Sequence, residues 1–152
     1  MVIRIRNQQR SKSLNLRKVR KDLAGAGALL GLADVELSIV FTGSMRMRSL
    51  NANYRGIPKE TDVLSFPMET PSSRFPVSVH PSLLMLGDIV ISVPRASRQA
   101  REYGVTLHEE LRRLLIHGLL HLAGYDHEKG RYQKVRMEKK EKELLNALKE
   151  MD

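Results

Sequence analysis

The alternation of apolar and polar residues along the chain predicts short β-strands. Residues 35–41 (VELSIVF) alternate in this way, and so do residues 62–66 (DVLSF), which Pro67 ends. Residues 86–93 (LGDIVISV) are almost continuously apolar and are expected to form a buried strand. Arginines interleave with a further apolar set at the start of the chain, which predicts an edge strand containing Val2, Ile3 and Ile5.

Helical periodicity separates these strands. Leucines and a valine recur at helical spacing over residues 14–30, with Ser13 as the expected N-cap and Gly31 as the end. Ser44 is expected to cap a second helix that runs to about residue 54. Three further helices are predicted in the C-terminal half. The first begins at Pro94, the second follows Thr106 as its N-cap, and the third begins near Gly130.

The order of these elements indicates the α+β class. About four strands are expected in one mixed sheet with the helices packed on it. The chain has 152 residues, which is the size of one domain, so we expect a single domain over residues 1–152. Residues 69–82 hold three prolines and no helical period, and are predicted to be a loop that is either a functional rim or simple surface variation.

The chain is strongly basic, with a formal net charge of +9 and a pI near 10.1. This charge indicates a polyanionic partner, nucleic acid first and an anionic membrane second. Residues 1–21 hold eight Lys and Arg residues and no acid, and are either an RNA-binding surface with salt-sensitive affinity or a solvated face. The sequence shows no signal peptide and no apolar run long enough to span a bilayer, so we expect a cytoplasmic protein that does not bind membranes.

Three of the five histidines lie in one segment, HGLLHLAGYDH, at residues 117–127. His117 and His121 are four residues apart in a leucine-rich stretch, so they project from one face of a helix. Gly124 supplies the residue with positive φ that commonly ends a helix, which lets His127 turn back toward the other two. Three imidazoles leave a fourth position for water, and the chain has no cysteine, so the segment predicts a catalytic zinc site.

The spacing of this segment, H-x3-H-x2-G-x2-H, is also that of the metzincin proteases. Those enzymes place a glutamate, their general base, directly after the first histidine, where this chain has Gly118. A glycine cannot accept a proton. The chain therefore has the metal ligands of a metzincin but lacks the general base of the peptidase mechanism.

Residues 51–67, which contain N-A-N-Y-R and T-D-V-L-S-F-P, form a second distinctive block, and residues 87–92 (GDIVIS) form a third. Together with the histidine segment, these blocks resemble the YbeY endoribonuclease family of bacterial rRNA maturation factors. The histidine block is the most specific of them. The N-terminal third of the chain is similar to the family only in its strand-then-helix layout.

The resemblance implies a zincin-like α+β fold, one zinc ion held by His117, His121 and His127, and hydrolysis of single-stranded RNA. It also implies a role in maturing the 3′ end of small-subunit rRNA and in ribosome quality control, with the ribosome or its small subunit as partner. The family's functional arginine falls on Arg55, which completes the catalytic set. Family members commonly carry an aspartate three residues after this arginine, where this chain has Pro58, so a carboxylate in this turn is in doubt.

For other polar residues near these blocks, the sequence gives less support for a catalytic or metal-binding role. Asp126 either orients a ligand histidine or forms a turn. Arg113 shares a helical face with His117 and either reaches a phosphate or pairs with Glu109 or Glu110. His108 lies nine residues before His117 and therefore on the opposite face, which excludes it as a ligand. The second block also contains two residues that we leave outside the catalytic set, Asp62 and Ser65.

Two other functions are compatible with the same residues. The first is a metalloprotease or another metallohydrolase whose general base lies outside the histidine segment. The second is a non-catalytic ribosome-associated factor with a structural zinc, which would require a fourth protein ligand such as Asp126 or Glu128.

Overall fold

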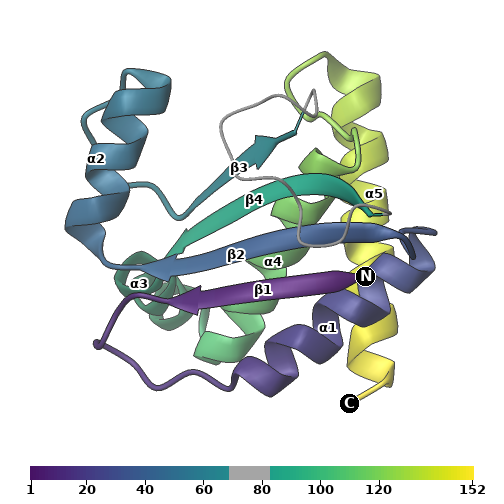
Figure 1. Cartoon of the computed structure of the whole chain (residues 1–152), viewed down its shortest axis with the longest axis horizontal. Helices are drawn as coiled ribbons and strands as arrows, with labels where there is room; N and C mark the ends of the chain where they lie inside the picture. The colour runs from purple at the N-terminus through teal and green to yellow at the C-terminus, as the bar shows by residue number, and fades with distance from the viewer. Residues whose placement is uncertain (69–82) are drawn as a thin grey trace.

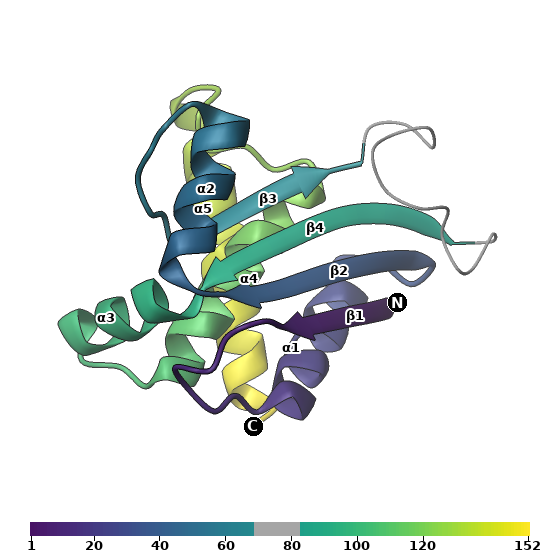
Figure 2. The same cartoon turned by 60° about the vertical axis from the view of Figure 1, so that its left-hand side comes forward.

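The computed structural model of the chain describes residues 1–68 and 83–152, so the loop predicted at residues 69–82 lies outside the described residues. The described residues form a sheet with helices on both of its faces (Figures 1 and 2). The strands are β1 (Val2–Asn7), β2 (Val35–Thr42), β3 (Val63–Pro67) and β4 (Leu84–Ser92). The helices are α1 (Leu16–Leu29), α2 (Ser44–Arg55), α3 (Val93–Tyr103), α4 (Leu107–Leu122) and α5 (Arg131–Glu150).

The sheet is mixed, and its strand order is β1-β2-β4-β3. β1 pairs with β2 and β2 with β4 in parallel, whereas β3 runs antiparallel to β4, with Ser65 opposite Ile89. These strands and helices confirm the predicted α+β class with a mixed sheet of four strands. Among residues 1–68 and 83–152, β1 and β3 form the two edges.

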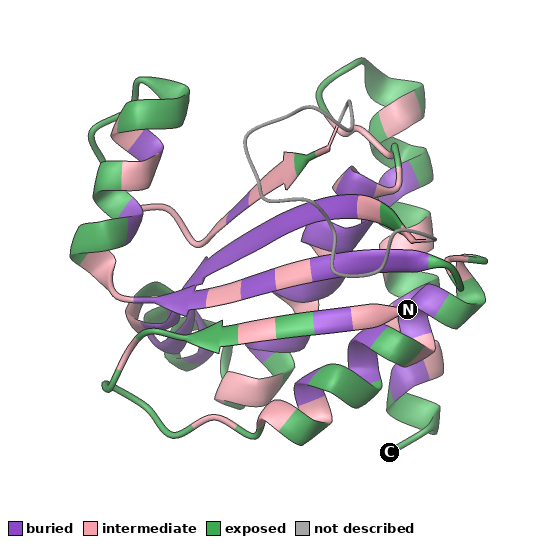
Figure 3. Cartoon of the chain, in the orientation of Figure 1, coloured by how far each residue is buried: buried purple, intermediate pink, exposed green. Residues whose placement is uncertain are grey.

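Alternate residues of β4 pack on opposite faces of the sheet, and each face has its own core. Ile89 and Ile91 belong to the larger core, which they share with buried side chains of α1, α4 and α5. Val90 points the other way and packs with Met47 of α2 and Leu64 of β3 in a smaller core. Most residues of β2 and β4 are therefore buried, because both faces of these central strands are covered (Figure 3).

Two predicted helix caps differ from the structure. Helix α1 begins at Leu16, and its N-cap is Asn15, whose Oδ1 accepts a hydrogen bond from the Lys18 N–H at 3.1 Å, so the prediction of Ser13 was wrong. Both residues are good N-caps, and the sequence does not separate them. Ser44 is the first residue of α2 rather than its cap, which is Gly43, and the Ser44 hydroxyl donates to Glu60 at 3.1 Å.

The other predicted boundaries are closer to the structure. Thr106 caps α4 and forms a capping box with Glu109, as expected, and Pro94 lies in the first turn of α3. The apolar side of α5 was predicted to include Val135, but this side chain is 53% exposed, and Met137 is buried instead. In the described parts of the chain, no helix combines the length and the apolar character needed to cross a membrane.

A buried ion-pair network joins α1 to the N-terminal half of α4. Arg112 donates to both carboxylate oxygens of Asp22, at 2.9 and 3.0 Å, and His108 Nε2 lies 2.9 Å from the same carboxylate. Burial alone would raise the pKa of Asp22, but the hydrogen bonds from His108 and Arg112 outweigh it, so the pKa lies below its ordinary value of 3.8. Asp22 therefore releases its proton more readily in the folded chain than in the unfolded chain.

We expect Asp22→Asn to destabilise the protein at neutral pH by about 3 kcal/mol, because it leaves the buried Arg112 with one charged partner fewer. The ionised Asp22 stabilises the fold above the unfolded-state pKa, and this contribution is lost as the pH falls below about 4. Urea unfolding at several pH values measures both effects. Between neutral pH and pH 3 the wild type should lose more stability than Asp22→Asn, whereas Asp34→Asn, at an exposed position, should follow the wild type. Equal acid sensitivity of wild type and Asp22→Asn would contradict this assignment.

Candidate metal centre and groove

Helix α4 carries the first two histidines of the cluster in its last two turns. The helix is held in place by apolar side chains that are at most 2% exposed, namely Leu111, Leu114, Leu115, Ile116, Leu119 and Leu120. Gly118 lies directly against β4, and a Cβ at this position would be 3.0 Å from Ile89 Cγ2. At the position of the metzincin general base, this chain therefore has a glycine that lets the helix pack closely on the sheet.

The turn after α4 brings the third histidine back to the first two. Gly124 has φ +101°, a conformation that favours glycine, and its N–H donates to the His121 carbonyl at 3.1 Å. The Tyr125 N–H donates to the Leu120 carbonyl at 2.9 Å, and the guanidinium of Arg136 from α5 lies 4.6 Å from the centre of the Tyr125 ring. As a result, the ring of His127 lies 4.8 Å from that of His121.

The nitrogen atoms of the cluster fit one metal ion. Nε2 of His117 and Nε2 of His121 are 3.2 Å apart, close to the separation of about 3.3 Å between two nitrogen ligands of a tetrahedral zinc. One nitrogen of each histidine lies within 4.8 Å of those of the other two. His127 Nδ1 is buried without a hydrogen-bond partner among the described residues. Burial and the two neighbouring histidines lower the pKa of His121, which favours the neutral form that a ligand requires.

Glu141 of α5 orients His117. Its Oε2 accepts a hydrogen bond from His117 Nδ1 at 3.2 Å, which leaves Nε2 with a lone pair directed at the cluster. The sequence analysis did not identify this residue. A signal was present, because Glu141 falls on the buried stripe of α5 at helical spacing with Met137, Leu144 and Leu148, where an acid is out of place.

The three histidines line a groove of about 560 Å³ that also contains Arg55. Arg55 is the last residue of α2, and its exposed side chain donates to no acceptor among residues 1–68 and 83–152. The residues from Thr61 to Phe66, in β3 and just before it, also line the groove. The structure therefore brings all four predicted site residues to one groove.

Asp62 and Ser65 also line this groove. Asp62 is held by its neighbours, because its Oδ1 accepts from the Val63 N–H at 2.8 Å and its Oδ2 accepts from Gln99 Nε2 at 3.3 Å. Gln99 donates in turn to the buried carboxylate of Glu110 at 2.7 Å. A polar chain thus runs from the groove to the N-terminal half of α4.

The remaining candidates take structural roles. Asp126 Oδ1 accepts from the Glu128 N–H at 2.7 Å and so forms the turn, which is one of the two roles expected. Arg113 is paired with Glu110 through two contacts of 2.8 Å, the second of its two predicted roles. His108 faces Asp22 and takes no part in the cluster.

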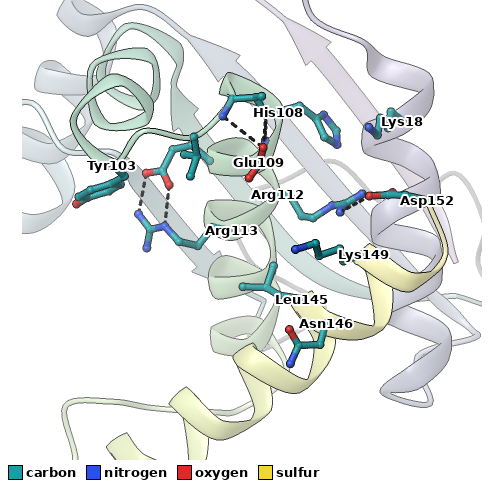
Figure 4. A pocket seen from close by; sticks show the side chains of 13 residues that line it. Lys18, Tyr103, His108, Glu109, Arg112, Arg113, Leu145, Asn146, Lys149 and Asp152 are labelled. Atoms are coloured by element: carbon teal, nitrogen blue, oxygen red, sulfur yellow. Dashed lines mark hydrogen bonds and ion pairs between the residues drawn. The ribbon is translucent and has the colours of Figure 1, made fainter.

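A second cavity, of about 870 Å³, lies at the N-terminal end of α4, beside α5 (Figure 4). Four of its charged side chains are paired with one another. Arg113 is paired with Glu110, and Arg112 with Asp152 at 2.7 and 3.1 Å. This cavity is larger than the groove, but it contains no member of the histidine cluster.

The family model described as Endoribonuclease YbeY matches residues 4–149 of this chain. The chain belongs to the endoribonuclease YbeY family. The match confirms the resemblance carried by the three sequence blocks and extends it over the N-terminal third, where only the layout was similar. It also includes Pro58, so the missing aspartate does not exclude the chain from the family.

Individual endoribonuclease YbeY proteins match over most of their length. The protein from Aquifex aeolicus is 44% identical over 140 residues, which are 89% of this chain and 88% of that protein. The protein from Geobacter sulfurreducens is 38% identical over 149 residues, which are 97% of this chain and 96% of that protein. The solution structure of TM1509 from Thermotoga maritima has a similar fold, with a TM-score of 0.65 at 26% identity over 97% of this chain and 89% of that one.

Replacing Glu141 by alanine should weaken the binding of a divalent metal about 10- to 100-fold, since His117 loses the acceptor that fixes its proton. Titration of the metal against a chromophoric chelator measures this affinity directly. Glu138→Ala, one turn earlier on α5 and with a side chain that is 62% exposed, is the matched control and should bind as the wild type does. Wild-type affinity in Glu141→Ala would refute this role.

Proposed function

We propose that this chain is a zinc-dependent endoribonuclease that cleaves single-stranded RNA, with residues 1–152 acting as one catalytic domain. The proposal rests on the convergence of three imidazoles in a groove that also contains Arg55. Membership of a family named for endoribonuclease activity supports RNA as the substrate. Within this proposal the RNA is ribosomal, and the enzyme matures the 3′ end of small-subunit rRNA and acts in ribosome quality control, in contact with the ribosome in the cytoplasm.

His117, His121 and His127 are the proposed zinc ligands. The set contains three nitrogen donors and no thiolate, because the chain has no cysteine, and this composition is typical of catalytic zinc sites. A zinc ion held there supplies Lewis acidity toward water and toward a phosphate oxygen. The contribution of the protein is geometric, since α4 sets the spacing of two rings and Glu141 keeps the proton of His117 on Nδ1, away from the metal.

Arg55 is the proposed phosphate-binding residue. Its guanidinium is charged at any working pH and offers two parallel N–H donors to the oxygens of one phosphate. Because charge accumulates on these oxygens during cleavage, a fixed cation beside them stabilises the transition state more than the ground state. Arg55 donates to no acceptor in the described part of the chain, so its donors are available for a substrate.

The two alternative functions have less support. A peptidase of the metzincin kind needs a carboxylate at position 118, where Gly118 packs on Ile89. A structural zinc needs a fourth protein ligand, and among residues 1–68 and 83–152 the cluster of possible ligands contains only the three histidines. Asp126, one of the two candidates for a fourth ligand, is engaged in the turn.

The basic segment at residues 1–21 remains a predicted contributor to RNA affinity. It forms β1 and the first turns of α1, at the sheet edge opposite β3 and the groove. Part of its charge is used inside the protein, because Arg4 pairs with Glu36 and Arg20 donates to the Ile3 carbonyl. Any contact of this segment with RNA therefore involves a part of the substrate distant from the histidine cluster.

Arg55→Ala should lower kcat/KM for a labelled single-stranded RNA by about 10²- to 10³-fold, because the negative charge on the phosphate oxygens is no longer stabilised by a positioned hydrogen-bond donor. Its zinc content, measured by elemental analysis, should stay at the wild-type level. His121→Ala should lose both the zinc and the cleavage. Arg101→Ala, at an exposed position on α3, is the matched control and should change kcat/KM less than about 3-fold.

The same preparations should be incubated with casein to test the peptidase alternative. Casein cleavage that disappears in His121→Ala, together with RNA that stays intact in the wild type, would overturn the proposed function. Full RNA cleavage by Arg55→Ala would overturn the role of Arg55 and leave the metal site in place.

A further inference from the structure

Two aromatic side chains stand in the groove beside the proposed phosphate-binding residue. Tyr54 precedes Arg55 in the last turn of α2, and Phe66 lies in β3. Their ring centroids are 5.1 Å apart with an interplanar angle of 61°. Both residues line the same groove as the three histidines.

The two rings differ in their environment. Phe66 is half-buried and packs against the small core of Met47, Leu64 and Val90, which fixes the position of its ring. Tyr54 rests against Phe66 but is 53% exposed. An aromatic side chain that is about half exposed in a groove lined mostly by polar residues adds little to the core, and such a surface is of the kind that a ligand covers.

We propose that Tyr54, supported by Phe66, is a stacking subsite for an unpaired nucleobase of the RNA, next to the phosphate held by Arg55. The inference rests on the proposed function and adds the residue that recognises the substrate. Proteins bind single-stranded RNA by stacking its bases on aromatic rings, and every base has a face suited to this contact. Within a duplex, each base is already stacked on its neighbours, so this subsite selects for single strands without reading their sequence.

The volume of the groove and the presence of Arg55 beside the rings agree with such a ligand. Its volume of about 560 Å³ is within the range of pockets that hold small organic molecules, about 300–1,000 Å³. Tyr54 and Arg55 both line the groove, so it contains a ring and a cation, as a base and its phosphate require. Tyr103 offers a contrast, because it is 60% exposed but lies outside this groove, at the second cavity, where Arg113 approaches its ring to 5.8 Å (Figure 4).

The test is a binding experiment with a fluorescent single-stranded RNA that carries 2′-O-methyl groups to slow cleavage, with strand integrity checked by gel after each titration. A single abasic site is moved along the strand, and the dissociation constant of the zinc-loaded protein is measured by anisotropy. In the wild type, one abasic position should weaken binding about 5- to 100-fold, because one base loses its stacking partner.

Tyr54→Ala should weaken binding of the intact strand by a similar factor and should abolish the extra penalty at that abasic position. Tyr54→Phe should behave as the wild type. Tyr54→Leu, which keeps an apolar side chain on Phe66 but has no aromatic face, should resemble Tyr54→Ala, and this outcome separates stacking from simple support of the fold. Tyr103→Ala is the matched control and should bind as the wild type does.

Wild-type affinity of Tyr54→Ala, an abasic penalty that persists in this variant, or wild-type binding by Tyr54→Leu would each overturn the stacking subsite. If the wild type still cleaves RNA in these cases, the proposed function stands. A wild-type protein that neither binds nor cleaves single-stranded RNA would overturn the proposed function, and the subsite with it.

Discussion

The close contact of α4 with β4 at Gly118 is the constraint on which the candidate metal centre depends. Without a Cβ at this position, the helix approaches the sheet until its backbone lies against Ile89, and the buried leucines on both sides of Gly118 then fix its rotation. His117 and His121 consequently leave the helix in one fixed direction, with their Nε2 atoms 3.2 Å apart. The spacing of a metal site is thus set by core packing rather than by the ligands themselves, and little ordering remains to be done when a cation binds.

The groove is built around β3, which is an edge strand among residues 1–68 and 83–152, from helices on opposite faces of the sheet. Helix α4 packs on one core and α2 on the other, so the distance between the histidines and Arg55 depends on the strands between them. Glu60 strengthens this connection by accepting hydrogen bonds from Ser44, Ser92 and Arg98. Burial would raise the pKa of Glu60, but these hydrogen bonds outweigh it and lower the pKa, so the carboxylate stays ionised and joins the start of α2 to that of α3.

Local features of the sequence predicted the elements and the histidine cluster, because both depend on short-range patterns. The spacing of His117, His121 and His127 around Gly124 needs only one helix and one turn, and the structure places the rings together. Glu141 and the pairing of Tyr54 with Phe66 depend instead on how α5 packs on α4 and how α2 packs on β3, which no local pattern specifies. Partners far apart in the chain, such as Asp22 and Arg112, were missed for the same reason.

The net charge predicted the class of partner but not the place where the partner meets the protein. The charged residues that line the groove are Arg55 and three carboxylates, those of Asp62, Asp126 and Glu128, besides the histidines. These side chains alone are net acidic and would repel a phosphate, while residues 1–21 hold most of the positive excess at the other edge of the sheet. A dication held by the histidines would offset this negative charge at short range, where the distant cations of β1 and α1 are largely screened by salt. In the proposed function, the basic surface therefore attracts RNA from a distance, whereas the acceptance of one phosphate in the groove depends on the metal together with Arg55.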